Sequence, residues 1–157
     1  MSNYERWRPD RASEIIAPFV STPGALMPIL HALQAAFGHV PDEATPIVAE
    51  ALNLSRADVH GVLTFYHDFR HELPGRKVLK LCQAEACQAR GARGITAQAQ
   101  SRLGVKLGET TDDGLVTLEA IYCLGLCASG PAALLDGKPV ARIDAARMDE
   151  LVEEAVS

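Results

Sequence analysis

The sequence lacks the features that mark several common classes of protein. No apolar run reaches the length of a membrane-spanning helix, and the charged N-terminus, "MSNYERWRPDRASE", has no apolar segment like that of a secretory signal. The formal net charge is −5, whereas a general nucleic-acid binder normally presents a basic face. We therefore expect a cytoplasmic protein with no direct membrane insertion and no nucleic-acid partner.

Motifs for nucleotide binding and for hydrolysis are also missing from the sequence. No G-x-G-x-x-G follows a strand pattern, and there is no P-loop. The order of the residues indicates no Ser-His-Asp or Cys-His arrangement. We therefore expect no catalytic residue, and no binding of NAD or flavin by this chain alone.

What is present indicates a packed protein of one or two small domains. The chain has 157 residues, of which 48% are apolar, enough for a hydrophobic core. The composition changes at "HELPGRK", residues 71–77, where helical patterns give way to mixed strands and helices. We expect a helical bundle over residues 1–72 and an α/β domain over residues 73–157, which together make an α+β fold.

Four short helices are predicted in the first part, because apolar residues recur there at helical spacing. Gly38 is placed to end the second helix, and Asp42 and Glu43 fall in the predicted first turn of the third. Ser55 and Asp58 resemble a capping box at the start of the fourth. The predicted segments begin near residue 10 and then cover residues 21–38, 41–54 and 55–69.

The second part predicts the order β-α-β-β-β-α, which suits a small layered α/β domain. Strands are expected over residues 76–82 and 114–123, with a helix over residues 86–104 between them. Asp136-Gly137 is a strong hairpin dipeptide between two short strands, and Asp144 is placed to cap a closing helix.

The four cysteines form the most informative pattern. Cys82 and Cys87 make C-x4-C, and after 35 residues Cys123 and Cys127 make C-x3-C. Each pair comes just after an apolar strand. If the two strands are neighbours in one sheet, both loops lie at the same edge, and four thiolates can converge there.

Three kinds of site could use four such thiolates. Structural zinc sites typically contain a tight C-x2-C pair, which is absent here. Dithiol redox sites usually carry C-x-x-C at the start of a helix, which is also absent. A [2Fe–2S] cluster tolerates wider loops, and plant-type ferredoxins also begin with a C-x4-C pair. The small residues of "LGLCASG" would let backbone N–H groups approach the sulfur atoms of such a cluster.

Several other residues have simpler interpretations. "VAEALNLSRADVHGVLTFY" has the outline of a DNA-binding helix pair, but we interpret it as two packed bundle helices. The five histidines are interpreted as solvated side chains. Phe65, Tyr66 and Phe69 are predicted to form a core stripe, with a docking surface as the alternative. Arg90 and Arg93 follow Cys87 and either offset the charge of a cluster or are solvated.

Taken together, these motifs resemble the thioredoxin-like [2Fe–2S] subunits of NADH:quinone oxidoreductase and related complexes. "LHALQAAFGHVP" and "VHGVLTFYHDF" are similar to the N-terminal helical motifs of that family. "CLGLCASGPA" is similar to its second cysteine loop, and the cysteine spacing is similar to its cluster signature. The resemblance covers the chain from about Ile15 to Val152.

The resemblance implies one [2Fe–2S] cluster bound by Cys82, Cys87, Cys123 and Cys127. It also implies a helical bundle followed by a thioredoxin-like domain, with a cis peptide bond before Pro131. Such a chain would be an electron-transfer subunit. Its expected partners are a flavin- and NAD-binding subunit and further iron–sulfur or catalytic subunits of the same complex.

The segment between the first two ligands bears on which complex this is. "LCQAEACQARG" is most similar to the gamma subunit of a soluble NAD-dependent formate dehydrogenase. The corresponding subunits of respiratory NADH:quinone oxidoreductase and of an NAD-reducing hydrogenase are the alternatives. A structural zinc module that mediates assembly is the alternative from a different class.

Overall fold

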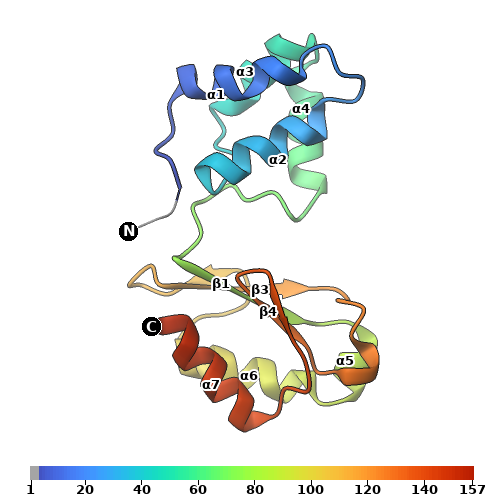
Figure 1. Cartoon of the computed structure of the whole chain (residues 1–157), viewed down its shortest axis with the longest axis vertical. Helices are drawn as coiled ribbons and strands as arrows, with labels where there is room; N and C mark the ends of the chain where they lie inside the picture. Colours follow the sequence, from blue (N-terminus) through green and yellow to red (C-terminus); the bar gives the residue numbers. More distant parts are fainter. Residues whose placement is uncertain (1–3) are drawn as a thin grey trace. The chain divides into compact units, whose positions relative to one another are not determined.

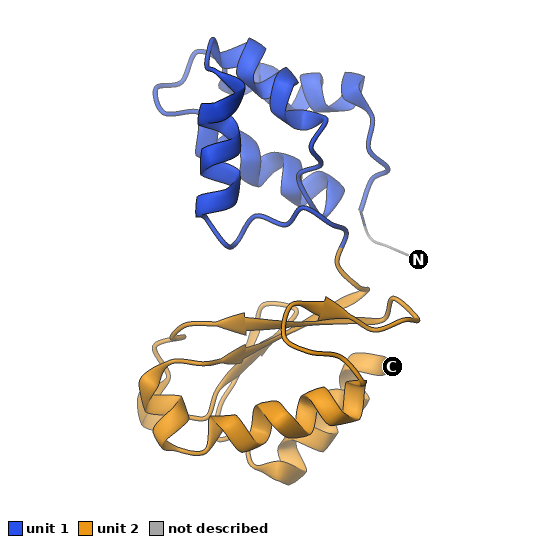
Figure 2. Ribbon diagram, turned by 180° about the vertical axis from the view of Figure 1, so that it is seen from behind, with its two compact units in different colours: residues 1–73 blue, residues 74–157 orange. Residues whose placement is uncertain are grey.

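The computed structural model describes residues 4–157. The chain divides into two compact units, Met1–Leu73 and Pro74–Ser157 (Figure 2). Among the described residues, helices are the only regular elements of the first unit, and the second unit contains a sheet with helices (Figure 1). This arrangement confirms the predicted α+β fold class.

The first unit is a small helical bundle with its own core. Its α-helices are α1 (Pro9–Ile16), α2 (Leu26–Phe37), α3 (Ala44–Leu52) and α4 (Arg56–Phe65), and a 3-10 turn, η1 (Ala17–Phe19), follows α1. The rings of Trp7 and Phe37 meet edge to face, with centroids 4.9 Å apart. The largest fully buried side chains of this core are Ile16, Ile29, Leu30, Leu33, Phe37, Val40, Val48 and Val59.

Local signals set most of the helix ends in this unit. Gly38 adopts a φ of +78° and its N–H bonds to Gln34 O, so it ends α2 as predicted. Ser55 and Asp58 form the predicted capping box at the start of α4. The third helix differs from the prediction, because α3 begins at Ala44. The chain forms a turn at Pro41, whose carbonyl accepts from Ala44 N–H, so the acidic residues at 42 and 43 precede the helix.

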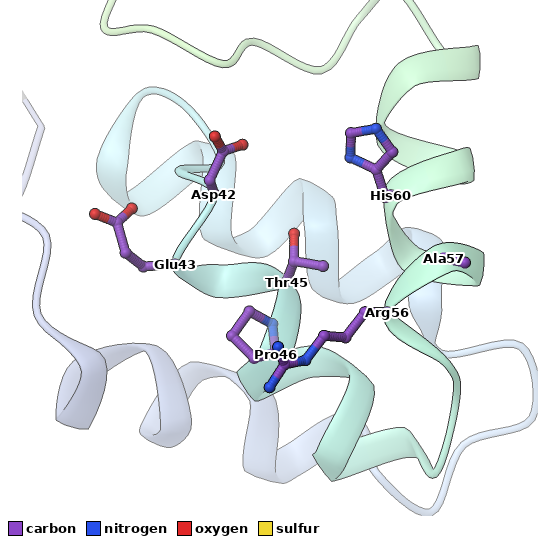
Figure 3. Close-up of a pocket in the computed structure, with 7 residues that line it drawn as sticks. All are labelled: Asp42, Glu43, Thr45, Pro46, Arg56, Ala57 and His60. Carbon is purple, nitrogen blue, oxygen red and sulfur yellow. The ribbon is translucent and has the colours of Figure 1, made fainter.

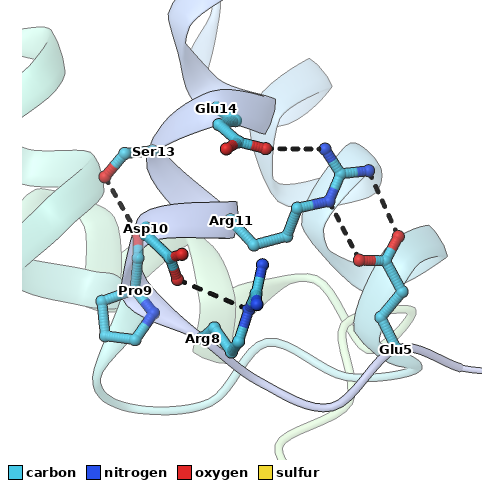
Figure 4. A network of polar contacts seen from close by, with 7 residues as sticks. All are labelled: Glu5, Arg8, Pro9, Asp10, Arg11, Ser13 and Glu14. Carbon is cyan, nitrogen blue, oxygen red and sulfur yellow. Dashed lines mark hydrogen bonds and ion pairs between the residues drawn. The ribbon is translucent and has the colours of Figure 1, made fainter.

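Polar contacts fasten the segment that leads into α1 (Figure 4). Arg11 pairs with Glu5 at 2.9 Å and with Glu14 at 3.1 Å. The N–H of Glu5 also donates to Ala36 O of α2 at 2.9 Å. Exposed ion pairs of this kind contribute about 0–1 kcal/mol each, so the apolar core is the main source of stability in this unit.

The second unit is built on a five-stranded sheet in the order β2-β3-β1-β4-β5. The strands are β1 (Lys77–Cys82), β2 (Glu109–Thr110), β3 (Val116–Ile121), β4 (Ala133–Leu135) and β5 (Lys138–Val140). The helices are α5 (Glu85–Ala89), α6 (Ala92–Leu103) and α7 (Ala145–Val156), and a 3-10 turn, η2 (Cys127–Ser129), precedes β4. Helices α6 and α7 lie on the same face of the sheet (Figures 1 and 2).

Strand β1 is the central strand and sets the register of the sheet. It pairs in parallel with β3, so that Cys82 lies opposite Ile121, and antiparallel with β4. Lys80 and Glu119 face each other across the parallel pair and form an ion pair at 3.1 Å. The apolar side chains of β1 and β3 pack in one core with those of α6 and α7.

Two predictions for this unit are wrong in detail. The helix expected over residues 86–104 is two helices, α5 and α6, because Gly91 adopts a φ of +94° between them. Strand β2 was not predicted, since two residues carry no readable alternation.

Other local predictions for this unit are confirmed. Asp136 and Gly137 both have positive φ in the hairpin between β4 and β5, and Asp144 caps α7 by accepting from Arg147 N–H. The Gly130–Pro131 peptide bond is cis, as the resemblance implied. No helix within residues 4–157 is long and apolar enough to cross a membrane.

Candidate metal centre

The predicted cysteines follow the two parallel strands where these end. Cys82 is the last residue of β1 and is only 3% exposed, and Cys123 comes two residues after the end of β3. Backbone hydrogen bonds fix this edge, from Cys82 N–H to Ala132 O at 3.0 Å and from Gln83 N–H to Ile121 O at 2.8 Å. The parallel register therefore brings the loop after β1 and the loop after β3 to the same edge, as predicted.

The first loop places two buried thiols together. Cys87 lies in the short helix α5 and is 2% exposed. Its thiol lies close to that of Cys82, and the N–H of Ala84 also lies near the sulfur of Cys82. Burial of both sulfur atoms excludes water from this side of the site, and protects any metal–thiolate bond formed there.

The second loop presents the other two thiols at the surface. The Sγ atoms of Cys123 and Cys127 lie 3.8 Å apart, and both residues are exposed. The N–H of Gly125 approaches Cys123 Sγ at 3.4 Å. Cys123 itself adopts a φ of +71°, which turns the chain sharply after β3.

Backbone donors join the two loops. The N–H groups of Cys123 and Leu124, in the second loop, lie near the sulfur of Cys82 in the first. The N–H of Ala132, which follows the second loop, lies near the sulfur of Cys87. These contacts bring the second loop against the first pair of thiols, and they supply the N–H donors that a negatively charged iron–sulfur cluster needs.

The same contacts lower the pKa of one thiol and raise the pKa values of two others. Burial works against ionisation of Cys82, but the N–H donors of Ala84, Cys123 and Leu124 and the thiol of Cys87 together lower its pKa below the ordinary value. Burial, together with Cys82, raises the pKa of Cys87. The hydrogen bond to Cys123 and the charge of that thiol raise the pKa of Cys127.

Gly130 leaves room for the first pair of thiols. A Cβ atom at this position would lie 3.0 Å from Cys87 Sγ and 3.6 Å from Cys127 O. No side chain therefore fits between the second loop and Cys87 without moving one of them. Because Gly130 has no side chain, the second loop can lie close to the sulfur of Cys87.

The donor set fits a [2Fe–2S] cluster. Four thiols arrive as two close pairs from two loops, and backbone N–H groups lie near the sulfur atoms of both pairs. Within residues 4–157, no three histidine, cysteine or carboxylate side chains are grouped so as to hold one metal ion. Two irons need only two protein thiolates each.

The other residues considered from the sequence differ in burial and in their contacts. His67 and His71 follow the end of α4 at Phe65 and share no helix face. Phe69 is buried as predicted, but Phe65 and Tyr66 are 70% and 45% exposed, so the prediction of a core stripe is wrong for these two. Arg93 is exposed, but Arg90 Nε donates to Gly130 O at 2.9 Å and is therefore not simply solvated.

The helical unit also has a surface groove. It lies between the start of α3 and the first turns of α4 (Figure 3). Its lining mixes acidic, basic and small side chains, namely Asp42, Glu43, Thr45, Pro46, Arg56, Ala57 and His60. None of these residues was predicted to bind a cofactor.

Sequence reasoning missed the backbone donors of the site. The N–H groups of Ala84, Leu124 and Ala132 belong to residues whose side chains carry no chemical signal. Only the run of small residues around Cys123 and Cys127 indicated that backbone would approach the sulfur atoms.

Comparisons with known proteins agree with this geometry. The E 2 subunit of the NADH-quinone oxidoreductase of Rhizobium meliloti (strain 1021) is 36% identical over 129 residues, which are 82% of this chain and 77% of that protein. The E subunit of the Escherichia coli (strain K12) NADH-quinone oxidoreductase is 37% identical over 116 residues, 74% of this chain and 70% of that one. The HndA subunit of the NADP-reducing hydrogenase of Solidesulfovibrio fructosivorans is 28% identical over 131 residues, 83% of this chain and 77% of that one.

A solved structure shows the same fold. The crystal structure of an NAD+-reducing [NiFe]-hydrogenase in the H2-reduced state matches 80% of this chain with a TM-score of 0.68 and 27% identity. The match covers only 22% of that hydrogenase chain, so this chain corresponds to about a fifth of a longer protein there.

The family model described as thioredoxin-like [2Fe-2S] ferredoxin matches residues 12–156, which include both units of the chain. The cofactor predicted from the sequence, a [2Fe–2S] cluster, is the one that this family carries. The chain therefore belongs to the thioredoxin-like [2Fe–2S] ferredoxin family.

Proposed function

We propose that Cys82, Cys87, Cys123 and Cys127 bind one [2Fe–2S] cluster and that the chain is an electron-transfer subunit. The observation that carries this proposal is the meeting of the two cysteine loops at one sheet edge, with backbone N–H groups of the second loop near the sulfur of Cys82. When bound, a [2Fe–2S] cluster takes up and gives back one electron. The protein supplies its position, its environment and its access.

The four cysteines divide this work between them. Cys82 and Cys87 are buried and keep water away from one side of the site, whereas Cys123 and Cys127 are exposed. Electron transfer requires a partner to come close to the site. The exposed side of the second loop is therefore where we expect that partner to approach.

The proposed partners follow from the relatives and from the sequence. Relatives of this chain are subunits of NADH-quinone oxidoreductases and of an NADP-reducing hydrogenase. We infer a flavin- and NAD-binding subunit as the direct partner, in a complex with further iron–sulfur or catalytic subunits. We place this complex in the cytoplasm, where thiols stay reduced.

Among such complexes we propose a soluble NAD-dependent formate dehydrogenase. This choice rests on "LCQAEACQARG", residues 81–91, which is similar to the gamma subunit of that enzyme. The names of the relatives favour a respiratory NADH-quinone oxidoreductase or a hydrogenase instead, and the experiment must separate the three.

Purification of the native complex through a tag on this chain is the direct test. The proposal predicts that a flavin-containing partner co-purifies with this chain. It also predicts that NADH reduces the cluster, which then gives a [2Fe–2S]-type paramagnetic signal. Addition of formate, hydrogen or a quinone then identifies the complex, and reduction of NAD by formate is the expected result. Purification of the chain without any flavin-containing partner would contradict the proposal. Reaction with hydrogen or quinone but not with formate would contradict the choice of formate dehydrogenase alone.

A further inference from the structure

Helix α5 carries Cys87 but is too short to be stable without help. It spans only Glu85–Ala89, and an isolated helix of one turn does not form in water. Tertiary contacts must therefore hold α5, and with it the buried thiol. Two side-chain hydrogen bonds join this segment to other parts of the unit, one from Gln88 and one from Arg90.

The first contact joins α5 to the end of β1. Gln88 Nε2 donates to Gln83 Oε1 at 3.0 Å, and Gln83 Nε2 donates to Thr96 Oγ1 at 3.0 Å. Thr96 is 7% exposed and donates in turn to Ala92 O at 2.8 Å. Each glutamine directly follows one cysteine of the first loop. The network thus links the residues next to Cys82 and Cys87 to each other and to α6.

The orientation of both amides in this network is fixed. Gln83 Nε2 lies 3.2 Å from Leu81 O, a carbonyl that can only accept, so Gln83 must turn its oxygen toward Gln88. Gln88 must then present its NH2 group to Gln83. Within residues 4–157, this arrangement leaves Gln88 Oε1 as a buried side-chain oxygen without a hydrogen-bond partner. An unpaired buried acceptor is unfavourable.

The second contact joins the end of α5 to the other cysteine loop. Arg90 Nε donates to Gly130 O at 2.9 Å. A Cβ atom at Gly130 would meet Cys87 Sγ at 3.0 Å and Arg90 Cδ at 3.7 Å. The guanidinium group thus holds the second loop at the point where that loop touches the buried thiol.

We infer that Gln88 and Arg90 are positioning residues that hold Cys87 between the two cysteine loops, Gln88 through Gln83 and Arg90 through Gly130. The inference rests on the proposed role of Cys87 as a ligand. With either contact removed, α5 gains freedom to move, and the distance of Cys87 from Cys82 or from the second loop is no longer fixed. The bound cluster should then be lost faster and its reduction potential should change.

Two substitutions in the full-length, cluster-containing chain test this inference. Gln88→Leu removes the amide donor at similar volume. Arg90→Lys keeps the positive charge but loses the Nε–H group that binds Gly130. We expect each to increase the rate of cluster loss to an iron chelator about tenfold, equivalent to about 1.4 kcal/mol. We also expect each to shift the midpoint potential. Arg90→Met should give a more negative potential than Arg90→Lys, because it also removes the charge.

Matched controls exist on α6. Gln98 donates to Ala145 O and Asp149, and Arg102 pairs with Asp149, so both hold α6 to α7 by the same kinds of contact. Gln98→Leu and Arg102→Lys should leave the rate of cluster loss within about twofold of that of the unchanged chain. Their midpoint potentials should equal that of the unchanged chain within experimental error. If Gln88→Leu and Arg90→Lys behave like these controls, the inference is wrong.

A milder variant covers the case in which Gln88→Leu holds no cluster. Gln88→Asn keeps the amide but withdraws it by one methylene group, so we expect an intermediate rate of loss with an unchanged far-UV circular dichroism spectrum. A rate equal to that of the unchanged chain would overturn the inference.

Cys87→Ser tests the proposed ligand role of Cys87 separately from the positioning role of Gln88 and Arg90. If this change leaves the cluster unaltered, the proposed ligand is wrong; if only Cys87→Ser alters it, the positioning role is wrong.

Discussion

Gly130 packs directly against the thiol of Cys87, so closely that a Cβ atom would lie 3.0 Å from the sulfur. The two residues belong to different cysteine loops, 43 positions apart in the sequence (130 minus 87). Their contact therefore sets the distance between the two cysteine loops. Substitution at Gly130 probes this spacing without changing any ligand.

Gly130→Ala should weaken retention of the cluster. The added methyl group must push either Cys87 or the second loop outward, so we expect lower iron content and faster loss of visible absorption. Gly94→Ala is the matched control, because a Cβ there meets nothing within 4 Å and Gly94 lies inside α6. That control should leave the cluster unchanged and stabilise the helix by about 0.5–1 kcal/mol. Equal cluster retention in the two variants would show that Gly130 does not set the spacing.

Each of the four cysteines should be necessary. Replacement of Cys82, Cys87, Cys123 or Cys127 by Ser offers a harder ligand that is less readily ionised, so we expect a weakened, altered or absent cluster in every case. Visible absorption and the paramagnetic signal of the reduced protein are the measurements. If one of the four changed freely, with spectrum and potential intact, the assignment of four thiolate ligands would fail.

The placement of the cysteines could be predicted because it depends on few and strong signals. The apolar runs before Cys82 and Cys123 indicated two strands, and parallel neighbours end at one edge of a sheet. The spacing of the four cysteines then limited the kinds of site. Helix ends at Gly38, Ser55 and Asp144 were predictable for the same reason, since each depends on one local interaction.

The remaining features depend on contacts that sequence patterns do not record. Gly91 separates α5 from α6 through a left-handed backbone, although the residues on both sides favour one helix. The N–H donors to Cys82 are set by how the loops meet, not by side-chain identity. Phe65 and Tyr66 follow the helical pattern but come at the end of α4, where no core element covers them.

The capping box of α4 should be the main local determinant of that helix. Ser55 Oγ accepts from Asp58 N–H at 3.0 Å, and Ser55 N–H donates to Asp58 Oδ2 at 3.2 Å. Ser55→Ala should lower the free energy of unfolding by about 1 kcal/mol, measured by urea denaturation followed by circular dichroism. Ser13→Ala is the control, since Ser13 lies within α1 and caps nothing. A loss of stability equal in both variants would contradict the capping role.

The two units should divide the work of the subunit. All four cysteines lie in the second unit, whose buried residues form their own core, separate from that of the helical unit. A chain truncated to residues 73–157 should therefore still assemble a cluster. We expect it to lose the flavin-containing partner, for which the exposed rings of Phe65 and Tyr66 offer a contact surface.

Co-expression of each chain with the flavin subunit, followed by pull-down and iron analysis, measures both properties. The full-length chain with Phe65→Ser and Tyr66→Ser is the matched comparison, because it keeps the helical unit and changes only the exposed rings. It should bind the partner more weakly at unchanged iron content. If the truncated chain bound its partner as well as the full-length chain does, the helical unit would not be the docking element.

The metal content of the anaerobically purified chain tests the central claim most directly. Four thiolate ligands in two pairs predict about two irons and two labile sulfides per chain, and a [2Fe–2S]-type paramagnetic signal on reduction. Zinc in stoichiometric amount, without iron and without visible colour, would contradict that claim and would identify the site as a structural zinc centre.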